Sequence, residues 1–302
     1  MKVLVTGATG FIGRHLCHHL AGEGHALRVV SRSPSRAGEG LPDPVEVTDW
    51  GSLTGPSSPG ALDGIDAVVN LAGETLAGRW TTAKRDLILT SRVVTTRHLV
   101  DGMRQSEVRP RVLVSASAVG YYGDRGEEEL TEESAPGSGF TAELCRAWEA
   151  EARRAEDLGV RVVRFRIGIV LGAHGGALAE MVPMFRRGLG GPFGNGRQWW
   201  PWIHVDDLSR LIAWALAEDS LSGPVNAVSS EPVRQVEFAR TLGGILHRPT
   251  FLWAPAMALR LVLGGFSGEL LSSRRALPSR VLSAGFGLTY PRLQTALAKA
   301  LS

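Results

Sequence analysis

The chain has 302 residues, enough for one large domain or for a domain with a smaller lobe. Its 44% hydrophobic and 21% charged residues are ordinary for a soluble globular protein. The net charge of +3 is spread along the chain, and phosphate recognition requires a stripe of basic residues, so a nucleic-acid partner is not expected.

Cysteine usage and hydropathy restrict the compartment. Cys17 and Cys145 both lie among apolar neighbours in segments of helical pattern, which fits two free thiols in a reducing cytosol. No segment reaches the roughly 18 apolar residues of a membrane span. The apolar start of the chain is broken by Gly7 and Gly10, so it does not resemble a signal peptide. We expect a cytoplasmic protein without a membrane partner, and the sequence is compatible with a homodimer.

The first thirty residues form a strand–helix–strand pattern. Lys2–Thr6 is a short apolar run typical of a buried parallel strand, Phe11–Ala21 has helical periodicity, and Leu27–Ser31 is a second strand. Three glycines punctuate the first turn, namely Gly7, Gly10 and Gly13. Glycines placed there allow a tight turn and a close approach of the backbone to a pyrophosphate, which the N–H groups at the helix start then bind. The alternative is a plain tight turn.

The end of the second strand indicates which dinucleotide binds. A site for NAD normally places a carboxylate about 20 residues after the glycines, where it binds the ribose 2′-hydroxyl. Here the strand ends in Ser31 and Arg32, and no acidic residue follows until Glu39. An arginine suits a 2′-phosphate, so NADP(H) is favoured over NAD(H). The alternative is that Arg32 simply faces solvent.

Strand and helix patterns continue to alternate after the first unit. They fall at Asp66–Leu71 (strand), Thr81–Met103 (helix), Arg111–Ser115 (strand), Gly139–Leu158 (helix) and Val160–Phe165 (strand). Residues 34–64 carry little structure beyond Val45–Val47. The alternation predicts an α/β fold, a doubly wound Rossmann sheet of parallel strands with helices on both faces.

Glycine and tryptophan are concentrated between Gly188 and His204. Glycine supplies turns and aromatic rings supply flat apolar walls, so the segment is expected to form a shaped loop over a pocket. Its aromatic residues are Phe193, Trp199, Trp200 and Trp202. The alternative, about equally favoured for any one tryptophan, is a hydrophobic corner where one lobe packs on the other.

A family resemblance rests on motifs distributed over the whole chain. The sequences TGATGFIG, VVNLAGE, VSASAVGYYG and WIHVDDL occur in an order and spacing that resemble an extended short-chain dehydrogenase/reductase, the superfamily of the sugar-nucleotide epimerases and dehydratases. More narrowly, SRVVTTRHL and the tail LPSRVLSAGFGLTYPRLQTALAKAL are similar to the epimerase-like subfamily of YfcH-type and SDR39U-type proteins. The resemblance implies a Rossmann domain over residues 1–228 and a small C-terminal α+β lobe over 229–302, with 172–200 contributing to the substrate lobe.

The resemblance also implies a set of cofactor contacts. Residues matching the pyrophosphate turn are Gly7, Thr9, Gly10, Phe11 and Ile12. Ser31 and Arg32 match the adenosine-phosphate position, and Leu71, Ala72 and Gly73 match the strand end beneath the adenine and ribose. Arg92 lies in the SRV motif, where a cation could reach the cofactor, although a salt bridge on a helix face is the alternative. Val170 lies where relatives surround the nicotinamide.

The family's usual catalytic groups are incomplete here. Its chemistry uses a Tyr to move a proton, a Lys four residues later to tune that Tyr, and a Ser or Thr to hold the substrate oxygen. Ser117 matches the serine. The Tyr and Lys positions fall on Thr141 and Cys145 if Glu149 matches the family's helix glutamate, or on Phe140 and Leu144 with the alignment shifted by one residue. Neither alignment restores the pair.

Three replacements are conceivable, and each has an ordinary structural alternative. Tyr121 or Tyr122 could supply the proton from the other wall of the pocket, or could simply line it. Glu143 could reach in from the helix if it is buried, or could be an exposed helix charge. Glu74, directly after NLAG, could act near the substrate or brace the backbone. Ser117, Tyr122 and Glu143 are therefore the candidate catalytic residues.

Histidines and acids elsewhere do not indicate a metal site. His204, Asp206 and Asp207 could do acid–base work, but the resemblance assigns this segment to bracing the sheet. His15, His18 and His19 are expected on a solvated helix face. The leading hypothesis is therefore an NADP(H)-dependent oxidoreductase or epimerase-like enzyme with a small carbonyl or sugar-type substrate. The alternatives are an NADPH-binding sensor without catalysis and a structural subunit with a tryptophan-rich binding surface.

Overall fold

A computed structural model of the chain describes residues 1–51, 58–173 and 175–302. Its strands are β1 (Lys2–Thr6), β2 (Ala26–Ser31), β3 (Glu46–Asp49), β4 (Ala67–Asn70), β5 (Val112–Ala118), β6 (Glu129–Leu130), β7 (Arg161–Ile167), β8 (Ile169–Leu171), β9 (Trp199–Trp200), β10 (Trp202–His204), β11 (Gly223–Ala227), β12 (Val233–Arg234) and β13 (Arg275–Ala276). Its α-helices are α1 (Phe11–Gly22), α2 (Pro34–Ala37), α4 (Thr82–Gln105), α5 (Phe140–Arg153), α6 (Gly176–Arg186), α7 (Val205–Ala217), α8 (Gln235–Ile245), α9 (Ala256–Leu263), α10 (Phe266–Leu271), α11 (Ser279–Ser283) and α12 (Leu293–Leu301). Three 3₁₀ turns complete the described structure, namely η1 (Ser58–Ala61), η2 (Val119–Tyr122) and η3 (Glu156–Leu158).

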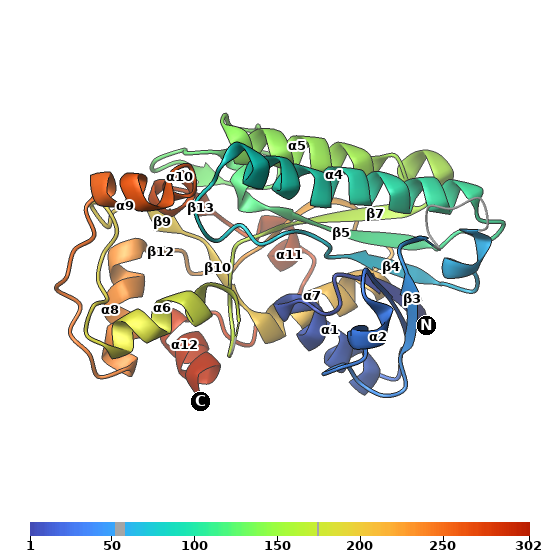
Figure 1. Cartoon of the computed structure of the whole chain (residues 1–302), viewed down its shortest axis with the longest axis horizontal. Helices are drawn as coiled ribbons and strands as arrows, with labels where there is room; N and C mark the ends of the chain where they lie inside the picture. The colour runs from blue at the N-terminus through green and yellow to red at the C-terminus, as the bar shows by residue number, and fades with distance from the viewer. Residues whose placement is uncertain (52–57, 174) are drawn as a thin grey trace.

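The centre of the molecule is a seven-stranded sheet in the order β11-β7-β5-β4-β1-β2-β3. Every neighbouring pair in it is parallel. Helices α4 and α5 cover one face, and α1 and α7 lie on the other (Figure 1). The predicted doubly wound Rossmann fold is thereby confirmed. The strand order reverses between β1 and β4, and such a switch point is where ligands bind in open α/β sheets.

Residues of β1 alternate between the two layers that cover the sheet. Val3 and Val5 pack in the cluster that contains Leu16 of α1, whereas Leu4 packs in the cluster that contains Leu99 of α4. Because both faces of the strand are covered, its side chains are apolar on both sides, as parallel strands require. The central strands are therefore fixed in position, and their carboxyl ends form a rigid edge.

The second half of the chain adds a smaller core beside the sheet. Helices α6, α8 and α12 pack around Trp200, Trp202 and Phe238, all of which are buried. Two tryptophans of the glycine-rich segment therefore form the hydrophobic corner that was the alternative to a pocket wall. Trp199 alone of the three is half-buried, and its ring lies beneath the guanidinium of Arg234 at 4.0 Å.

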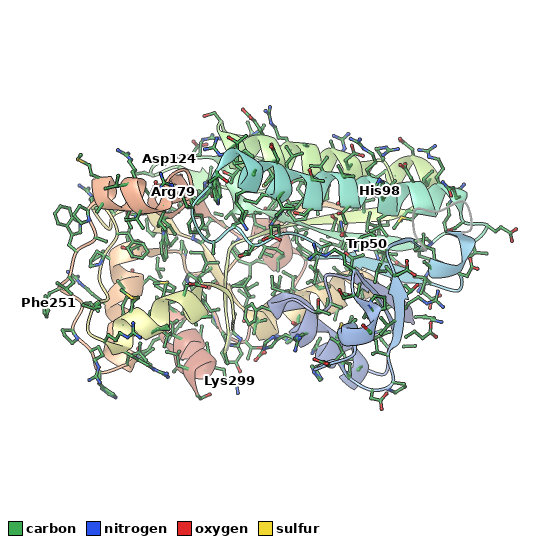
Figure 2. All side chains as sticks on the ribbon, in the orientation of Figure 1. Trp50, Arg79, His98, Asp124, Phe251 and Lys299 are labelled. Carbon is green, nitrogen blue, oxygen red and sulfur yellow. The ribbon has the colours of Figure 1, made fainter. Side chains whose placement is uncertain are left out.

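The segment from α9 to β13 returns to the Rossmann part of the molecule. Strand β13 pairs with β6, and an isolated bridge joins Trp80 to Gly264. Figure 2 shows Arg79 and Asp124 close to α10, and Asp124 accepts a hydrogen bond from the backbone N–H of Ser273 at 3.1 Å. The C-terminal segment thus covers the amino-terminal ends of α4 and α5 (Figure 1).

Most element boundaries lie within two residues of the sequence expectations, and two differ by more. The helix expected over Gly139–Leu158 ends at Arg153 and is followed by η3. Gly159, in a left-handed conformation (φ 77°), ends η3. Strand β5 extends past Ser115 to Ala118 and so includes Ser117. Within the described ranges, no helix is long and apolar enough to cross a membrane.

Candidate functional site

The backbone segments at the glycine-rich turn pack so closely that the positions of Gly7 and Gly13 cannot accommodate a side chain. Gly7 has a φ of 72°, and a Cβ there would lie 2.7 Å from the carbonyl carbon of Leu71. A Cβ on Gly13 would lie 2.2 Å from the Gly7 carbonyl oxygen. Both contacts are far inside van der Waals distance, so the first strand, its helix and the end of β4 can meet only through glycine.

The start of α1 is open in the way that an anion site requires. Thr9 and Gly10 are exposed, and Gly10 caps the helix without a side-chain hydrogen bond. The N–H groups of the first turn therefore face outward without a side-chain acceptor from the cap. Phe11 and Ile12 are half-buried, and the Phe11 ring fits so closely against the loop after β8 that a Cβ on Gly175 would lie 2.2 Å from it.

Arg32 projects from the carboxyl end of β2, next to the half-buried Ser31. It is exposed, and no carboxylate in the described part of the chain lies within ion-pair distance of it. Its positive charge nevertheless contributes to holding the pKa of Glu74 below the usual range, an effect due mainly to the hydrogen bond from Lys84. Arg32 thus faces the same edge of the sheet as Glu74, without an ion-pair partner among the described residues.

A polar network fixes the end of β4. Thr6 donates to Asn70 at 2.7 Å, and Asn70 donates to Thr96 of α4 at 2.8 Å. Trp148 of α5 also donates to Thr96, at 2.9 Å. Because these buried groups satisfy one another, the chain leaves the sheet at Leu71 in one defined direction.

The segment Leu71–Gly73 then runs past the turn at Gly7. Leu71 and Ala72 are half-buried and Gly73 is exposed, and the Ala72 N–H donates to Thr6 at 3.3 Å. Val170 lies in β8, paired with Ile203 of β10, and is buried. These residues line the same edge of the sheet as the turn at Gly7.

Arg92 is a half-buried cation beside this edge. Its guanidinium lies 5.3 Å from the Trp148 ring and donates to the Ile88 carbonyl at 3.2 Å. A Cβ on Gly73 would lie 3.0 Å from the guanidinium carbon. Burial lowers the pKa of Arg92, and nearby Cys145 and Glu74 oppose that shift. The helix-face salt bridge considered from the sequence is not among the ion pairs of the described residues.

Ser117, Thr141 and Cys145 come together at the carboxyl end of β5. Ser117 is buried, donates to Glu149 at 2.8 Å and lies within hydrogen-bonding reach of the Cys145 thiol. Thr141 lies one turn before Cys145 and is buried against Gly120, whose Cβ would meet the Thr141 Cβ at 3.1 Å. This placement favours the alignment that puts Thr141 and Cys145, rather than Phe140 and Leu144, in the Tyr and Lys positions.

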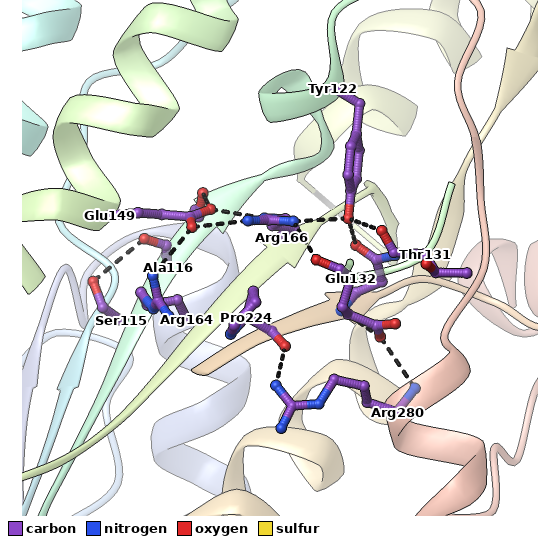
Figure 3. Close-up of polar contacts among 12 residues, drawn as sticks. Ser115, Ala116, Tyr122, Thr131, Glu132, Glu149, Arg164, Arg166, Pro224 and Arg280 are labelled. Atoms are coloured by element: carbon purple, nitrogen blue, oxygen red, sulfur yellow. Dashed lines mark hydrogen bonds and ion pairs between the residues drawn. The ribbon is translucent and has the colours of Figure 1, made fainter. Parts of the chain in front are cut away.

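Tyr122 belongs to a buried network behind Ser117. Its side chain is 0% exposed, and its hydroxyl donates to Asn226 at 2.7 Å and accepts from Arg166 at 3.0 Å. Burial raises the pKa of Tyr122 to about 12, although Arg166 opposes the shift. Figure 3 shows Arg166 lying between Tyr122 and Glu149. The hydroxyl is therefore occupied inside the fold. Tyr121 is half-buried, with the Arg166 guanidinium 3.4 Å from its ring centre.

The other acidic candidates have clear surroundings. Glu143 is exposed on α5 and so lacks the burial on which its proposed role depends. Glu74 forms an ion pair with Lys84 at 2.8 Å, and its backbone N–H donates to Ser91 at 2.9 Å, as expected of a brace. Both residues remain predictions as catalytic groups.

His204 and Asp207 hold backbone groups in place at the start of α7 and in the C-terminal segment. His204 accepts the backbone N–H of Asp206 at 3.2 Å and caps α7, and the buried Asp207 accepts the N–H groups of Thr289 and Tyr290 at 2.8 Å. In α1, by contrast, the histidine side chains bind backbone or a neighbouring acid, His18 reaching the Gly40 carbonyl and His19 pairing with Glu23. Among the described residues, no group of three His, Cys, Asp or Glu could hold a metal ion.

Two features of the site were missed from the sequence. The ion pair between Glu149 and Arg166 joins positions on a helix and a strand, and no spacing rule connects them. Glu269 of α10 accepts the Thr141 hydroxyl at 2.6 Å, although 128 residues separate the two. Two surface hollows of about 460 Å³ lie away from this site, and one of them is lined by residues at the amino ends of β7 and β11.

The strand order, the glycine turn and the switch point between β1 and β4 define a Rossmann-type α/β protein with a glycine-rich first turn. The profile of the NAD dependent epimerase/dehydratase family matches residues 3–227, and the chain belongs to this family. Residues 254–300 match a second profile, described as a domain of unknown function, DUF1731.

Individual relatives are similar over nearly the whole chain. An epimerase family protein from Arabidopsis thaliana, the chloroplastic SDR39U1 homologue, is 42% identical, with 98% of this chain and 86% of that protein covered. The epimerase family protein YfhF of Bacillus subtilis is 36% identical over 100% of this chain and 98% of its own. The family resemblance stated from the sequence is therefore confirmed.

Among solved structures, human epimerase family protein SDR39U1 with NADPH superimposes with a TM-score of 0.91 at 35% identity, covering 99% of both chains. The cofactor in that crystal structure is the one that the sequence predicts here. A UDP-glucuronic acid 4-epimerase from Bacillus cereus has a TM-score of 0.80 at 18% identity, which supports the fold alone.

Proposed function

We propose that this protein binds NADP(H) at the carboxyl edge of β1, β2 and β4 and acts as an epimerase/dehydratase-like oxidoreductase on a small carbonyl or sugar-type substrate. The pyrophosphate would be held by Gly7, Thr9, Gly10, Phe11 and Ile12. The 2′-phosphate would meet Ser31 and Arg32, and the adenine and its ribose would lie over Leu71, Ala72 and Gly73. Arg92 and Val170 would border the nicotinamide half.

The observation that carries the proposal is the close approach at Gly7. Because Gly7 has no Cβ, the Leu71 backbone packs directly against the turn, where a Cβ would lie 2.7 Å from it, and the turn leads into the start of α1, which has no side-chain cap. A turn of this kind fits a pyrophosphate, because backbone N–H groups at the helix start can approach its oxygens closely. Arg32, which has no carboxylate partner among the described residues, supports the choice of a 2′-phosphorylated dinucleotide.

The bound dinucleotide would supply hydride chemistry. Within the chain, Ser117 would hold a substrate oxygen. Its hydroxyl proton is directed to Glu149 at 2.8 Å, so Ser117 would act as an acceptor toward a substrate hydroxyl. Tyr122 and Glu143 stay predictions as proton-transfer groups. The enclosed hydroxyl of Tyr122 and the exposure of Glu143 give neither much support.

A sensor that binds NADPH without catalysis is the second candidate. It is favoured by the residues at the two positions that usually carry the acid–base pair. A thiol carries no positive charge in either protonation state, so Cys145 cannot supply the cation of a lysine. Burial raises the pKa of this thiol to about 12, with Glu149 adding to the rise, so it remains neutral. Thr141 is likewise a weaker acid than tyrosine.

We also propose that the chain divides functionally near residue 228. The Rossmann part would span 1–228 and the small lobe 229–302, with residues 172–200 contributing to the lobe. This division is supported by the last strand of the large sheet, β11, which ends at Ala227, and by the separate core of α6, α8 and α12.

The test combines mass measurement with turnover. Native mass spectrometry of the gently purified protein should find NADP(H), and a second bound molecule would identify the substrate class. A panel of carbonyl compounds and sugar nucleotides is then assayed with NADPH and NADP⁺. Turnover supports the enzyme, NADPH binding without turnover or second ligand favours the sensor, and a protein that refuses added NADPH contradicts both.

A further inference from the structure

A carboxylate from the C-terminal segment reaches the position where the family's proton-transfer residue is missing. Thr141, at the start of α5, donates its hydroxyl proton to Glu269 of α10 at 2.6 Å. Glu269 lies outside the epimerase profile, in the part of the chain that matches DUF1731. The contact therefore joins the Rossmann part to the small lobe at the site itself.

The carboxylate is held from two sides. Its second oxygen pairs with the Arg274 guanidinium at 3.0 Å, and Arg274 in turn donates to the Gly123 carbonyl at 2.8 Å. The side chains of Glu269 and Arg274 are 19% and 8% exposed. A charge-assisted pair that is largely shielded from water is stronger than an exposed one, so Glu269 has a defined position over the end of η2.

Packing brings α10 to this place independently of the charges. The Trp80 ring lies 5.2 Å from Phe140 of α5 and 5.7 Å from Phe266 of α10, so one tryptophan joins the two helix starts. The indole N–H of Trp80 donates to the Leu76 carbonyl at 2.7 Å. The approach of Glu269 to Thr141 is therefore supported by an aromatic cluster and does not depend on one hydrogen bond.

The surrounding groups make this a chemical site. Ser117 and Cys145 lie next to Thr141 on the buried side of α5, and the charge of Glu269 is among the influences that add to burial in raising the pKa of Cys145. Arg92 of α4 interacts electrostatically with Cys145. Hydroxyls, a carboxylate and a cation are thus gathered at the carboxyl edge of the sheet, where ligands bind in folds of this class.

We infer that Glu269 is the acid–base carboxylate of the active site and works together with the Thr141 hydroxyl. The inference rests on the proposed function. A threonine hydroxyl moves a proton only with an adjacent base, and Glu269 is the carboxylate that receives its hydrogen bond. The small lobe therefore contributes a reacting group as well as substrate contacts.

For oxidation of an alcohol, the substrate hydroxyl would give its proton to the Thr141 oxygen as the Thr141 proton passes to the Glu269 carboxylate, along the hydrogen bond already present. The C–H bond of the alcohol carbon breaks, its electron pair leaves as a hydride to the bound oxidised dinucleotide, and the electrons left on oxygen form the C=O π bond. The Glu269 carboxyl then releases its proton to water. Reduction of a carbonyl runs the same transfers in reverse.

The test is the relative affinity for oxidised and reduced cofactor in the whole protein carrying Glu269→Gln. The nicotinamide ring of NADP⁺ bears a positive charge that NADPH lacks, so a carboxylate beside it favours NADP⁺. Glutamine keeps the size and can still accept from Thr141. We expect the Kd for NADP⁺ to rise about three- to tenfold relative to the Kd for NADPH.

The matched control is Glu129→Gln. Glu129 also pairs with an arginine, Arg275, at 2.9 Å, but its side chain is 55% exposed. This variant should leave the ratio of the two Kd values, and any turnover, unchanged. Thr141→Val keeps the carboxylate and should preserve the ratio, while turnover of any substrate found with the panel falls at least about tenfold because the hydroxyl is lost.

Each result decides one question. An unchanged ratio in Glu269→Gln, or an equal loss for both cofactors, would show that Glu269 only anchors the small lobe and would overturn the inference while leaving NADP(H) binding intact. Full turnover in Thr141→Val would overturn the proton transfer through its hydroxyl. A wild-type protein that binds neither cofactor would instead overturn the proposed function itself, and this inference with it.

Discussion

Glu149 and Arg166 form an ion pair in the interior, with Arg166 Nε 2.9 Å from Glu149 Oε1 and side chains only 5% and 4% exposed. Arg166 also donates to the Glu132 carbonyl at 3.1 Å, and Glu149 accepts from Ser117. Burial acts to lower the pKa of Arg166, but its hydrogen bond to Glu149 and the charge of that carboxylate outweigh burial and raise it. One charge pair therefore connects the candidate site to the loop beneath it (Figure 3).

Removing one member of this pair should be costly. Arg166→Met leaves the Glu149 carboxylate buried without its main partner, and we expect a loss of about 3–5 kcal/mol in the free energy of unfolding. The double variant Arg166→Met/Glu149→Leu should recover part of that loss, which urea denaturation would measure. For comparison, Arg97→Met at the more exposed pair with Glu151 should cost less than about 1 kcal/mol. If the loss of stability in the double variant equals the sum of the losses in Arg166→Met and Glu149→Leu measured separately, the two side chains are not coupled.

Replacing Gly7 should be costly mainly because of a steric clash, and a comparison with Gly24 separates that clash from the cost of the backbone angle. In Gly7→Ala the new methyl group clashes with the Leu71 carbonyl, and alanine also disfavours the positive φ at this position. We expect a loss of about 3 kcal/mol or more in the free energy of unfolding, together with loss of NADPH binding. Gly24 has a similar φ of 79° but open space around it, so Gly24→Ala should cost only about 1–2 kcal/mol and leave binding intact. Thermal unfolding would measure the stability of both variants, and fluorescence titration would measure their affinity for NADPH. Equal effects in the two variants would show that the close approach of Leu71 to Gly7 is not the cause.

Arg32 should select the phosphorylated cofactor. Arg32→Ala removes a charge-assisted contact worth about 1.5–3 kcal/mol, so the affinity for NADPH should fall about ten- to a hundredfold while that for NADH changes little. Calorimetric titration with both cofactors is the measurement. Equal losses for NADPH and NADH would remove Arg32 from the 2′-phosphate site.

The buried thiol of Cys17 should make stability depend on alkaline pH. Burial raises its pKa from an ordinary 9.0 to about 12, so below pH 9 the thiol is protonated in both the folded and the unfolded chain. Between these two values only the unfolded chain ionises, and stability is lost as the pH rises. At about pH 10.5 the loss from this group is on the order of 2 kcal/mol. Urea denaturation of wild type and Cys17→Ala at pH 7 and pH 10.5 isolates it, because the variant lacks this contribution. Parallel losses in the two proteins would refute the assignment.

The elements with clear periodicity were predictable from the sequence. Lys2–Thr6 is predictable as a strand because Val3, Leu4 and Val5 suit burial on both faces. Thr81 is predictable as a helix start because threonine is a favoured cap, and its side chain accepts the Lys84 N–H. Cys17 and Cys145 were expected to be buried free thiols, and they are. These features depend on local chemistry that a short window of sequence contains.

Other features depend on partners that are distant in the chain. From the sequence alone, Trp200 and Trp202 are equally compatible with a pocket wall and with a hydrophobic corner. In the structure, α8 and α12 pack against both side chains. Tyr122 looks like a proton donor until Arg166 and Asn226 are found at its hydroxyl. These contacts join elements that are distant in the sequence, so the spacing of residues within one helix or strand does not predict them.

The strand order has a consequence for synthesis of the chain. β1 emerges first and lies inside the sheet; β2 and then β3 add to one side of it, and β4, β5, β7 and β11 add in succession to the other. Every strand of the large sheet after β1 therefore meets an edge that already exists when it leaves the ribosome. No strand has to be inserted between two others, so the sheet can grow outward at the pace of translation, and its exposed edge is covered by the next strand to arrive.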